Sequence, residues 1–95
     1  MNAKEKLKTI DDLVELINDC GYEDIVIFNN PDYASAFVGV SDDNRAIYDY
    51  EKMIKHLIKE WNCDNMEAIE FIDYNSIRSL PYYENAPIIM YPLTI

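Results

Sequence analysis

The chain has 95 residues, 49% of them apolar, and its 18 acidic against eight basic side chains give a formal net charge of −10. This length suits a single domain, residues 1–95, with one core. Only two glycines are present, which excludes a glycine-rich phosphate-binding loop, and the charge argues against direct binding to nucleic acid or to an anionic membrane.

The N-terminal part predicts a lead-in followed by a capped helix. Residues 1–8 are polar and are expected to be flexible. Thr9 and Asp12 have the spacing of a capping box, in which each side chain binds the other residue's backbone N–H. Apolar residues then recur at helical spacing as far as Gly21, a residue suited to the left-handed turn after a helix. We therefore expect a helix over about 10–20.

The next segment predicts three strands. Residues 25–28 are a continuous β-rich run typical of a buried strand, and 34–40 alternate in the manner of a half-buried one. Turn residues fill 29–32 and 41–44, and a third strand is expected over 45–48. Short loops between the strands predict an antiparallel meander.

The second half predicts two helices and a last strand. Asp49 can cap a helix over about 50–62, and Asp64 with Glu67 can open another that ends near residue 74. A loop with two prolines follows over 75–87.

Residues 88–91 are expected to form the fourth strand. The fold class is then α+β: a mostly antiparallel four-stranded sheet with helices on one face, in the order α-β-β-β-α-α-β. The last strand can pair at an edge or beside the first strand, and the sequence does not decide between these positions.

No motif points to catalysis, a metal or a cofactor. His56 is the only histidine and is expected to be a solvated helix residue, since no neighbour in the sequence would activate it. Cys20 and Cys63 lack the paired spacing of a zinc site. The run 42–44 has the residues of a calcium loop but not its glycine or final glutamate, and a hairpin turn explains it better.

The composition also bears on the compartment. Two cysteines are too few for a disulfide scaffold, residues 1–8 hold no apolar stretch of a signal peptide, and no run approaches the about 20 apolar residues of a membrane span. We expect a cytoplasmic protein with reduced thiols and no membrane contact.

The acidic residues gather in two stretches that could bind a basic partner. Carboxylates three or four residues apart on a helix loosely match the spacing of phosphates along DNA, and the alternative is an ordinary solvated face. The candidate residues are Asp11, Asp12, Glu15 and Asp19 in the first helix, and Glu60, Glu67, Glu70 and Asp73 further on.

Tyrosines next to prolines are the second unusual feature. Tyr33, Tyr82 and Tyr83 are expected in loops, where tyrosine offers a large contact area with a polar tip. They could equally pack beneath the loops or cover a sheet edge. Arg78, the only arginine of the second half, is expected to tie its loop to Asp73 or Glu70, and the alternative is a binding residue amid negative charge.

About residues 22–93 resemble a group of small acidic proteins carried by phages and conjugative elements of low-GC Gram-positive bacteria. The resemblance rests on the run 67–75, on Ile77-Arg78, on Leu80-Pro81-Tyr82 and on 86–92, and the stretch 31–50 fits the same group. It implies a mobile-element origin inside a bacterial host cell. It implies no activity, catalytic residue or ligand.

These observations lead to two hypotheses and a third that is weaker. The first is an acidic binding protein that inhibits a host nucleic-acid-handling defence protein by mimicking nucleic acid. The second is a structural or accessory module that forms a homodimer, for example by pairing an exposed sheet edge. An enzyme ranks last, because no nucleophile, base and metal set converges in the sequence.

Overall fold

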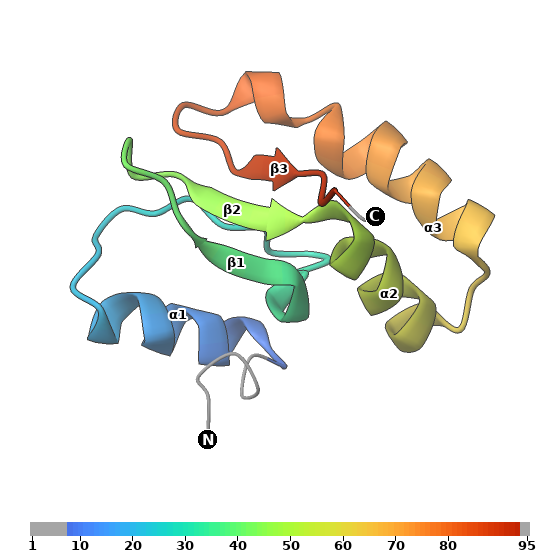
Figure 1. Ribbon diagram of the computed structural model, residues 1–95, viewed down its shortest axis with the longest axis horizontal. Coiled ribbons are helices and arrows are strands. Elements are labelled where there is room, and N and C mark those ends of the chain that lie inside the picture. Colours follow the sequence, from blue (N-terminus) through green and yellow to red (C-terminus); the bar gives the residue numbers. More distant parts are fainter. Residues whose placement is uncertain (1–7, 94–95) are drawn as a thin grey trace.

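The computed structural model describes residues 8–93 and shows three helices against a small sheet (Figure 1). The helices are α1 (Ile10–Asp19), α2 (Tyr50–Trp61) and α3 (Asn65–Phe71), and the strands are β1 (Phe37–Val40), β2 (Ala46–Asp49) and β3 (Ile88–Met90). Single turns of tighter or wider helix, η2 (Ala34–Ala36), η3 (Ile72–Ile77) and η4 (Leu80–Tyr82), complete the chain. The expected lead-in lies, apart from Lys8, outside the described residues.

The helix starts were predicted correctly, because each is set by a local cap. Thr9 and Asp12 form the complete capping box of α1, and Gly21 follows the helix with a φ of +84°. Asp49 accepts a hydrogen bond from the Lys52 backbone N–H at 3.1 Å and caps α2. Asp64 does the same for α3 through the Glu67 N–H at 2.8 Å.

The predicted four-stranded antiparallel sheet is wrong. The sheet has three strands in the order β1-β2-β3, with β1 antiparallel and β3 parallel to β2, so the class α+β stands but the sheet is mixed. Of the two positions left open for the last strand, β3 takes an edge. The long helical connection through α2 and α3 permits this parallel direction, because a parallel neighbour requires a crossover of about a dozen residues or more.

The predicted strand over 25–28 is absent, and the backbone of Phe28 bonds to a side chain in place of a neighbouring strand. The Phe28 backbone N–H donates to the Tyr48 hydroxyl at 3.3 Å, and the Phe28 ring packs edge-on against Tyr33 and Tyr48 with centroids 5.2 and 4.9 Å away. The four residues lie half-buried against the core without a strand partner.

The predicted strand over 34–40 begins only at Phe37. Asp32 Oδ1 accepts from the Ala34 N–H at 3.0 Å, and Tyr33 has a φ of +46°. The Ala36 N–H then donates to the Tyr33 carbonyl at 2.8 Å, so the backbone turns as η2 before it extends. This local side-chain bond competes with the sheet.

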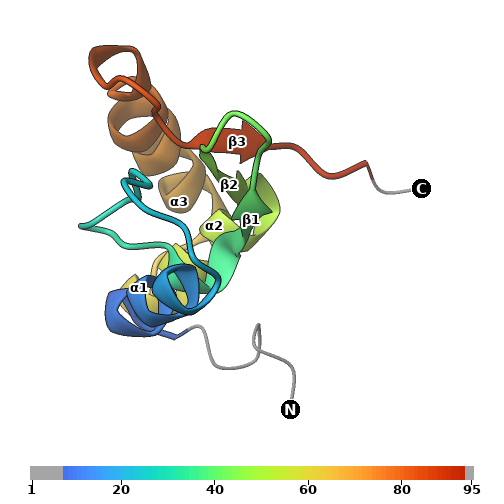
Figure 2. The ribbon, with the colours of Figure 1, turned by 90° about the vertical axis from the view of Figure 1, so that its left-hand side faces the viewer.

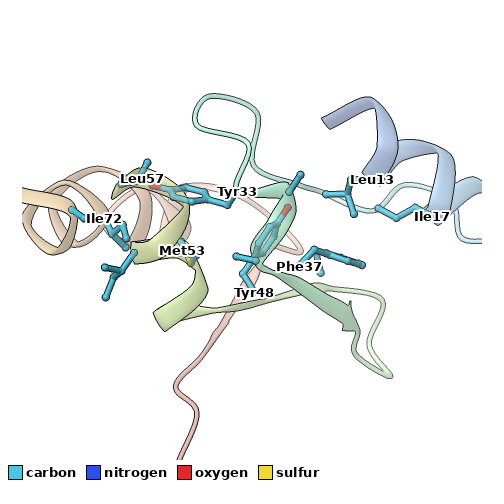
Figure 3. Close-up of a cluster of buried hydrophobic side chains, with 13 residues drawn as sticks. Leu13, Ile17, Tyr33, Phe37, Tyr48, Met53, Leu57 and Ile72 are labelled. Carbon is cyan, nitrogen blue, oxygen red and sulfur yellow. The ribbon is translucent and has the colours of Figure 1, made fainter. Parts of the chain in front are cut away.

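One face of the sheet forms the core together with the helices. Tyr48 and Ala46 of β2 are fully buried with side chains from α1, α2 and η3, and Figure 3 shows this cluster, including Leu13, Met53, Leu57 and Ile72. Figure 2 shows the helices to one side of the sheet, and the face of β2 that carries Tyr48 and Ala46 is turned toward them. The opposite face is different in character. The register places Ile47, Ile88 and Met90 together there, and none of the three belongs to the core cluster.

Candidate binding surfaces

The predicted acidic residues are at the surface but do not form one face. Asp11, Glu15 and Asp19 are exposed on α1, whereas Glu67, Glu70 and Asp73 are exposed on α3 and η3. The two helices lie at different ends of the molecule in Figure 1, with α1 below β1 and α3 above α2. The two stretches are therefore separate candidates.

Asp12 and Glu60 have other surroundings. Asp12 Oδ2 accepts from the backbone N–H groups of Lys8 and Thr9 at 3.1 and 3.2 Å, and the bond from Lys8 leads the causes that lower the pKa of this carboxyl. Asp12 is thus occupied as a helix cap. Glu60 lines a depression whose other charged residues are lysines.

The α3 side combines acids with exposed apolar side chains. Segment 60–84 holds six acidic residues and a single basic one, Arg78. It also contributes five of the nine large apolar side chains that are exposed among the described residues. We call the following exposed set the acidic–aromatic surface: Met66, Glu67, Glu70, Asp73, Tyr74, Tyr82 and Tyr83.

The tyrosines divide into two kinds. Tyr82 and Tyr83 are 87% and 59% exposed, as a contact role requires. Tyr33 is fully buried and its hydroxyl lies 2.6 Å from Ser76 Oγ, so its predicted role as a surface contact is wrong. Burial raises the pKa of Tyr33 to about 12, against the opposing effect of the Ser76 hydrogen bond. The helical turn η2 places this ring in the core, which the neighbouring proline did not indicate.

Local contacts define the edges of the acidic–aromatic surface. Asp73 Oδ1 accepts from the Tyr50 hydroxyl at 3.0 Å, and burial, followed by this bond and the Asp73 charge, raises the pKa of Tyr50 to about 12. The Arg78 guanidinium lies 5.2 Å from the centre of the Tyr74 ring. Arg78 therefore stacks on a tyrosine, and no ion pair within 4.0 Å joins it to a described acid, so the predicted tie to Asp73 or Glu70 is wrong.

An uncharged cleft adjoins this surface. It has a volume of about 460 Å³ and lies between the irregular segment 26–31 and the segment from Phe71 to Pro87. Tyr83 and Asn75 belong to its wall, and Ser76, the partner of the buried Tyr33, lines it as well. No lining residue is charged. A cleft of this kind can take an apolar or aromatic side chain.

The histidine was expected to be solvated and is instead buried. His56 Nδ1 lies 2.8 Å from Ser35 Oγ, and His56 Nε2 lies 3.5 Å from Asp32 Oδ1, with the His56 side chain 7% exposed. Sequence reasoning missed this group because its members come from η2 and α2. One signal was available: His56 stands three residues after Met53 and next to Leu57, on the apolar stripe of α2.

The group has the residue types of a hydrolase triad but a structural explanation. Asp32 Oδ1 already accepts the Ala34 N–H at 3.0 Å, and its 3.5 Å separation from Nε2 exceeds a strong hydrogen bond. Together the contacts attach the turn η2 to α2, an interface that also includes the Tyr33 ring 5.8 Å from the imidazole.

Further features give no site of their own. Within residues 8–93 no group of three or more His, Cys, Asp or Glu side chains could hold a metal ion. Cys63 Sγ donates to the Leu57 carbonyl at 3.6 Å, and Cys20 is exposed. The described helices include none with the length and apolar character needed to cross a membrane.

Comparison with known proteins adds no relative. No family model, no curated protein and no solved structure matches the chain. The candidate surfaces therefore stand on their geometry alone.

Proposed function

We propose that this protein is a non-catalytic binding module that recognises a basic surface of another macromolecule through its acidic–aromatic surface. The carrying observation is that three exposed carboxylates, Glu67, Glu70 and Asp73, lie within one segment, residues 66–83, with four exposed large apolar side chains. Carboxylates steer a basic partner into contact, and tyrosines supply contact area at low entropic cost.

The adjoining cleft supports the same proposal. Interfaces take most of their binding energy from a few anchors that fill well-packed pockets, surrounded by a polar rim. Here an uncharged cleft of about 460 Å³ meets the acidic–aromatic surface at Tyr83. The partner that fits has an apolar or aromatic anchor flanked by Lys or Arg.

The partner class follows from charge. Proteins that handle nucleic acid present basic grooves, and the carboxylates on α3 have a separation loosely like that of phosphates on one DNA strand. With the mobile-element origin that the sequence resemblance implies, this favours an inhibitor of a host defence nuclease that acts by nucleic-acid mimicry in the bacterial cytoplasm.

A charge-matched pair of variants tests the proposal. One variant carries Glu67→Gln, Glu70→Gln and Asp73→Asn, and the control carries Asp11→Asn, Glu15→Gln and Asp19→Asn, so each loses three negative charges. The wild type and each variant are immobilised and used to capture proteins from a host lysate at low and at physiological salt. We expect the wild type and the control to retain the same host proteins at low salt, and the α3 variant not to retain them. The retained proteins should elute from the wild type as the salt concentration rises, and duplex DNA should displace them.

Two results would overturn it. Equal losses for both variants would mean that net charge, and not the α3 surface, is responsible. Retention that ignores salt and competing DNA would exclude electrostatic mimicry.

A specific observation favours a second candidate, a homodimer. The outward sheet face carries Ile47, Ile88 and Met90, and just beyond β3 Tyr91 and Leu93 are 59% and 96% exposed. A second copy placed on this face would bury these side chains against each other. Light scattering at increasing concentration should then give twice the monomer mass, and Ile47→Lys should restore the monomer. A monomer at every concentration excludes the dimer and leaves the first proposal intact.

A further inference from the structure

All described lysines of this acidic chain line one depression. Its volume is about 360 Å³, and Glu60 is the only acid in its wall. We call it the lysine depression, and its lining residues are Lys8, Ser35, Lys52, Lys55, His56, Lys59 and Glu60. In a chain with net charge −10, this local excess of positive charge runs against the composition.

The lysines are not neutralised by ion pairs with described residues. The ion pairs within 4.0 Å over residues 8–93 join Arg45 to Asp43 and His56 to Asp32, and none involves a lysine. Lys55 has no such pair although Glu51 stands four residues before it, at a spacing that suits one. Lys52 and Lys55, and Lys55 and Lys59, are themselves three and four residues apart, where like charges destabilise a helix. An anion in the depression would relieve this repulsion.

The wall also offers a neutral donor held in place. Ser35 is exposed, and its Oγ lies 2.8 Å from Nδ1 of the buried His56. Asp32 Oδ1 lies 3.5 Å from the other ring nitrogen, too far for a strong hydrogen bond. When Nδ1 donates to Ser35 Oγ, the hydroxyl proton is free for a ligand.

We propose that the lysine depression binds a phosphorylated small molecule that carries two or more negative charges. Lysine is a compact charge that suits phosphate oxygens, and the volume lies within the range of small-ligand sites. Lys52 and Lys59 are separated by about 10 Å along the helix axis, which leaves room for more than one phosphoryl group. This site is independent of the acidic–aromatic surface.

Calorimetry with inorganic phosphate, pyrophosphate and tripolyphosphate at constant ionic strength tests the proposal. Affinity should rise with the number of phosphoryl groups, and chloride should not compete at matched ionic strength. Lys55→Gln should weaken pyrophosphate binding about fivefold or more, and Lys55→Gln with Lys59→Gln at least tenfold. Ser35→Ala should weaken it about threefold to tenfold, because one hydrogen bond to the anion is lost. A comparison of the affinities for adenosine diphosphate and for pyrophosphate then shows whether a nucleoside contributes to binding.

Arg78→Gln is the matched control, because it removes one positive charge from an exposed residue outside the depression. It should change pyrophosphate affinity less than twofold. Thermal unfolding of each variant checks that the fold is retained. Equal losses from Lys55→Gln and Arg78→Gln, or no binding of pyrophosphate beyond that of chloride, would overturn the proposal.

Discussion

The hydroxyl groups of Tyr33 and Ser76 lie 2.6 Å apart in the interior and join the turn before η2 to the turn of η3, 43 residues later. Both side chains are buried, so each oxygen depends on the other in place of water. The backbone carbonyl of Ser76 accepts a hydrogen bond from Ser79 Oγ at 2.8 Å, and this bond holds the following turn. This bond supports the wall of the cleft beside the acidic–aromatic surface.

Ser76→Ala should destabilise the protein by about 1–3 kcal/mol, because it leaves the Tyr33 hydroxyl buried without its partner. Tyr33→Phe with Ser76→Ala should be less destabilising than the sum of the single changes. Urea denaturation of the four proteins in the cycle measures the coupling. Additive effects would show that the two hydroxyls do not depend on each other.

Stability should fall as the pH rises from about 10 toward 12. The pKa of Tyr33 is raised to about 12 in the fold, so the unfolded chain releases this proton first, near pH 10. The stabilisation is therefore complete below pH 10 and is lost as the pH rises through the folded value. Far-ultraviolet circular dichroism with tyrosinate absorbance measures this, and Tyr33→Phe should make the loss shallower. An unchanged alkaline profile in Tyr33→Phe would contradict the assignment.

Asp49→Ala should destabilise the protein by about 1–2 kcal/mol, since the cap of α2 is lost where the chain leaves β2. Asp49→Asn keeps an oxygen that can accept the Lys52 N–H and should retain most of the stability. Thermal unfolding of the pair separates the cap from the charge. Equal losses in both variants would indicate that the charge is what matters.

The wild type should hydrolyse an activated ester such as p-nitrophenyl acetate no faster than the background reaction, and Ser35→Ala should not change this rate. Asp32 Oδ1 lies 3.5 Å from His56 Nε2, longer than a strong hydrogen bond, and the Ser35–His56 contact attaches η2 to α2. His56→Ala should instead lower stability by about 1–3 kcal/mol. Wild-type turnover above background that both changes abolish would contradict the proposal that the protein is non-catalytic.

The sequence predicted the parts of the fold that depend on neighbours along the chain. The starts of α1 and α2 follow from Thr9 and Asp49, whose caps act within three residues. The strands depended on distant groups: Phe28 bonds to a hydroxyl 20 residues later, and no local pattern encodes that. The direction of β3 could not be predicted in the same way, because a connection that holds two helices is long enough for either a parallel or an antiparallel return.

The candidate surfaces divide in the same way. Exposure of Glu67, Glu70 and Asp73 agrees with the helical spacing, whereas burial of Tyr33 depends on a positive φ and on Ser76. Lys52, Lys55 and Lys59 stand at helical spacing in the sequence, but only the fold brings Lys8 and Ser35 to them.

The parallel pairing of β3 with β2 also matters during synthesis. Ile88 pairs with Ile47, so the ribosome adds 41 residues, 88 minus 47, after Ile47 before the pair can form. At about 5–20 residues per second this takes about 2–8 s, and the backbone groups of β2 that β3 covers have no strand partner on that side until then. An open strand edge invites pairing with other chains, and the surplus of carboxylates in the emerging helices discourages that encounter by mutual repulsion.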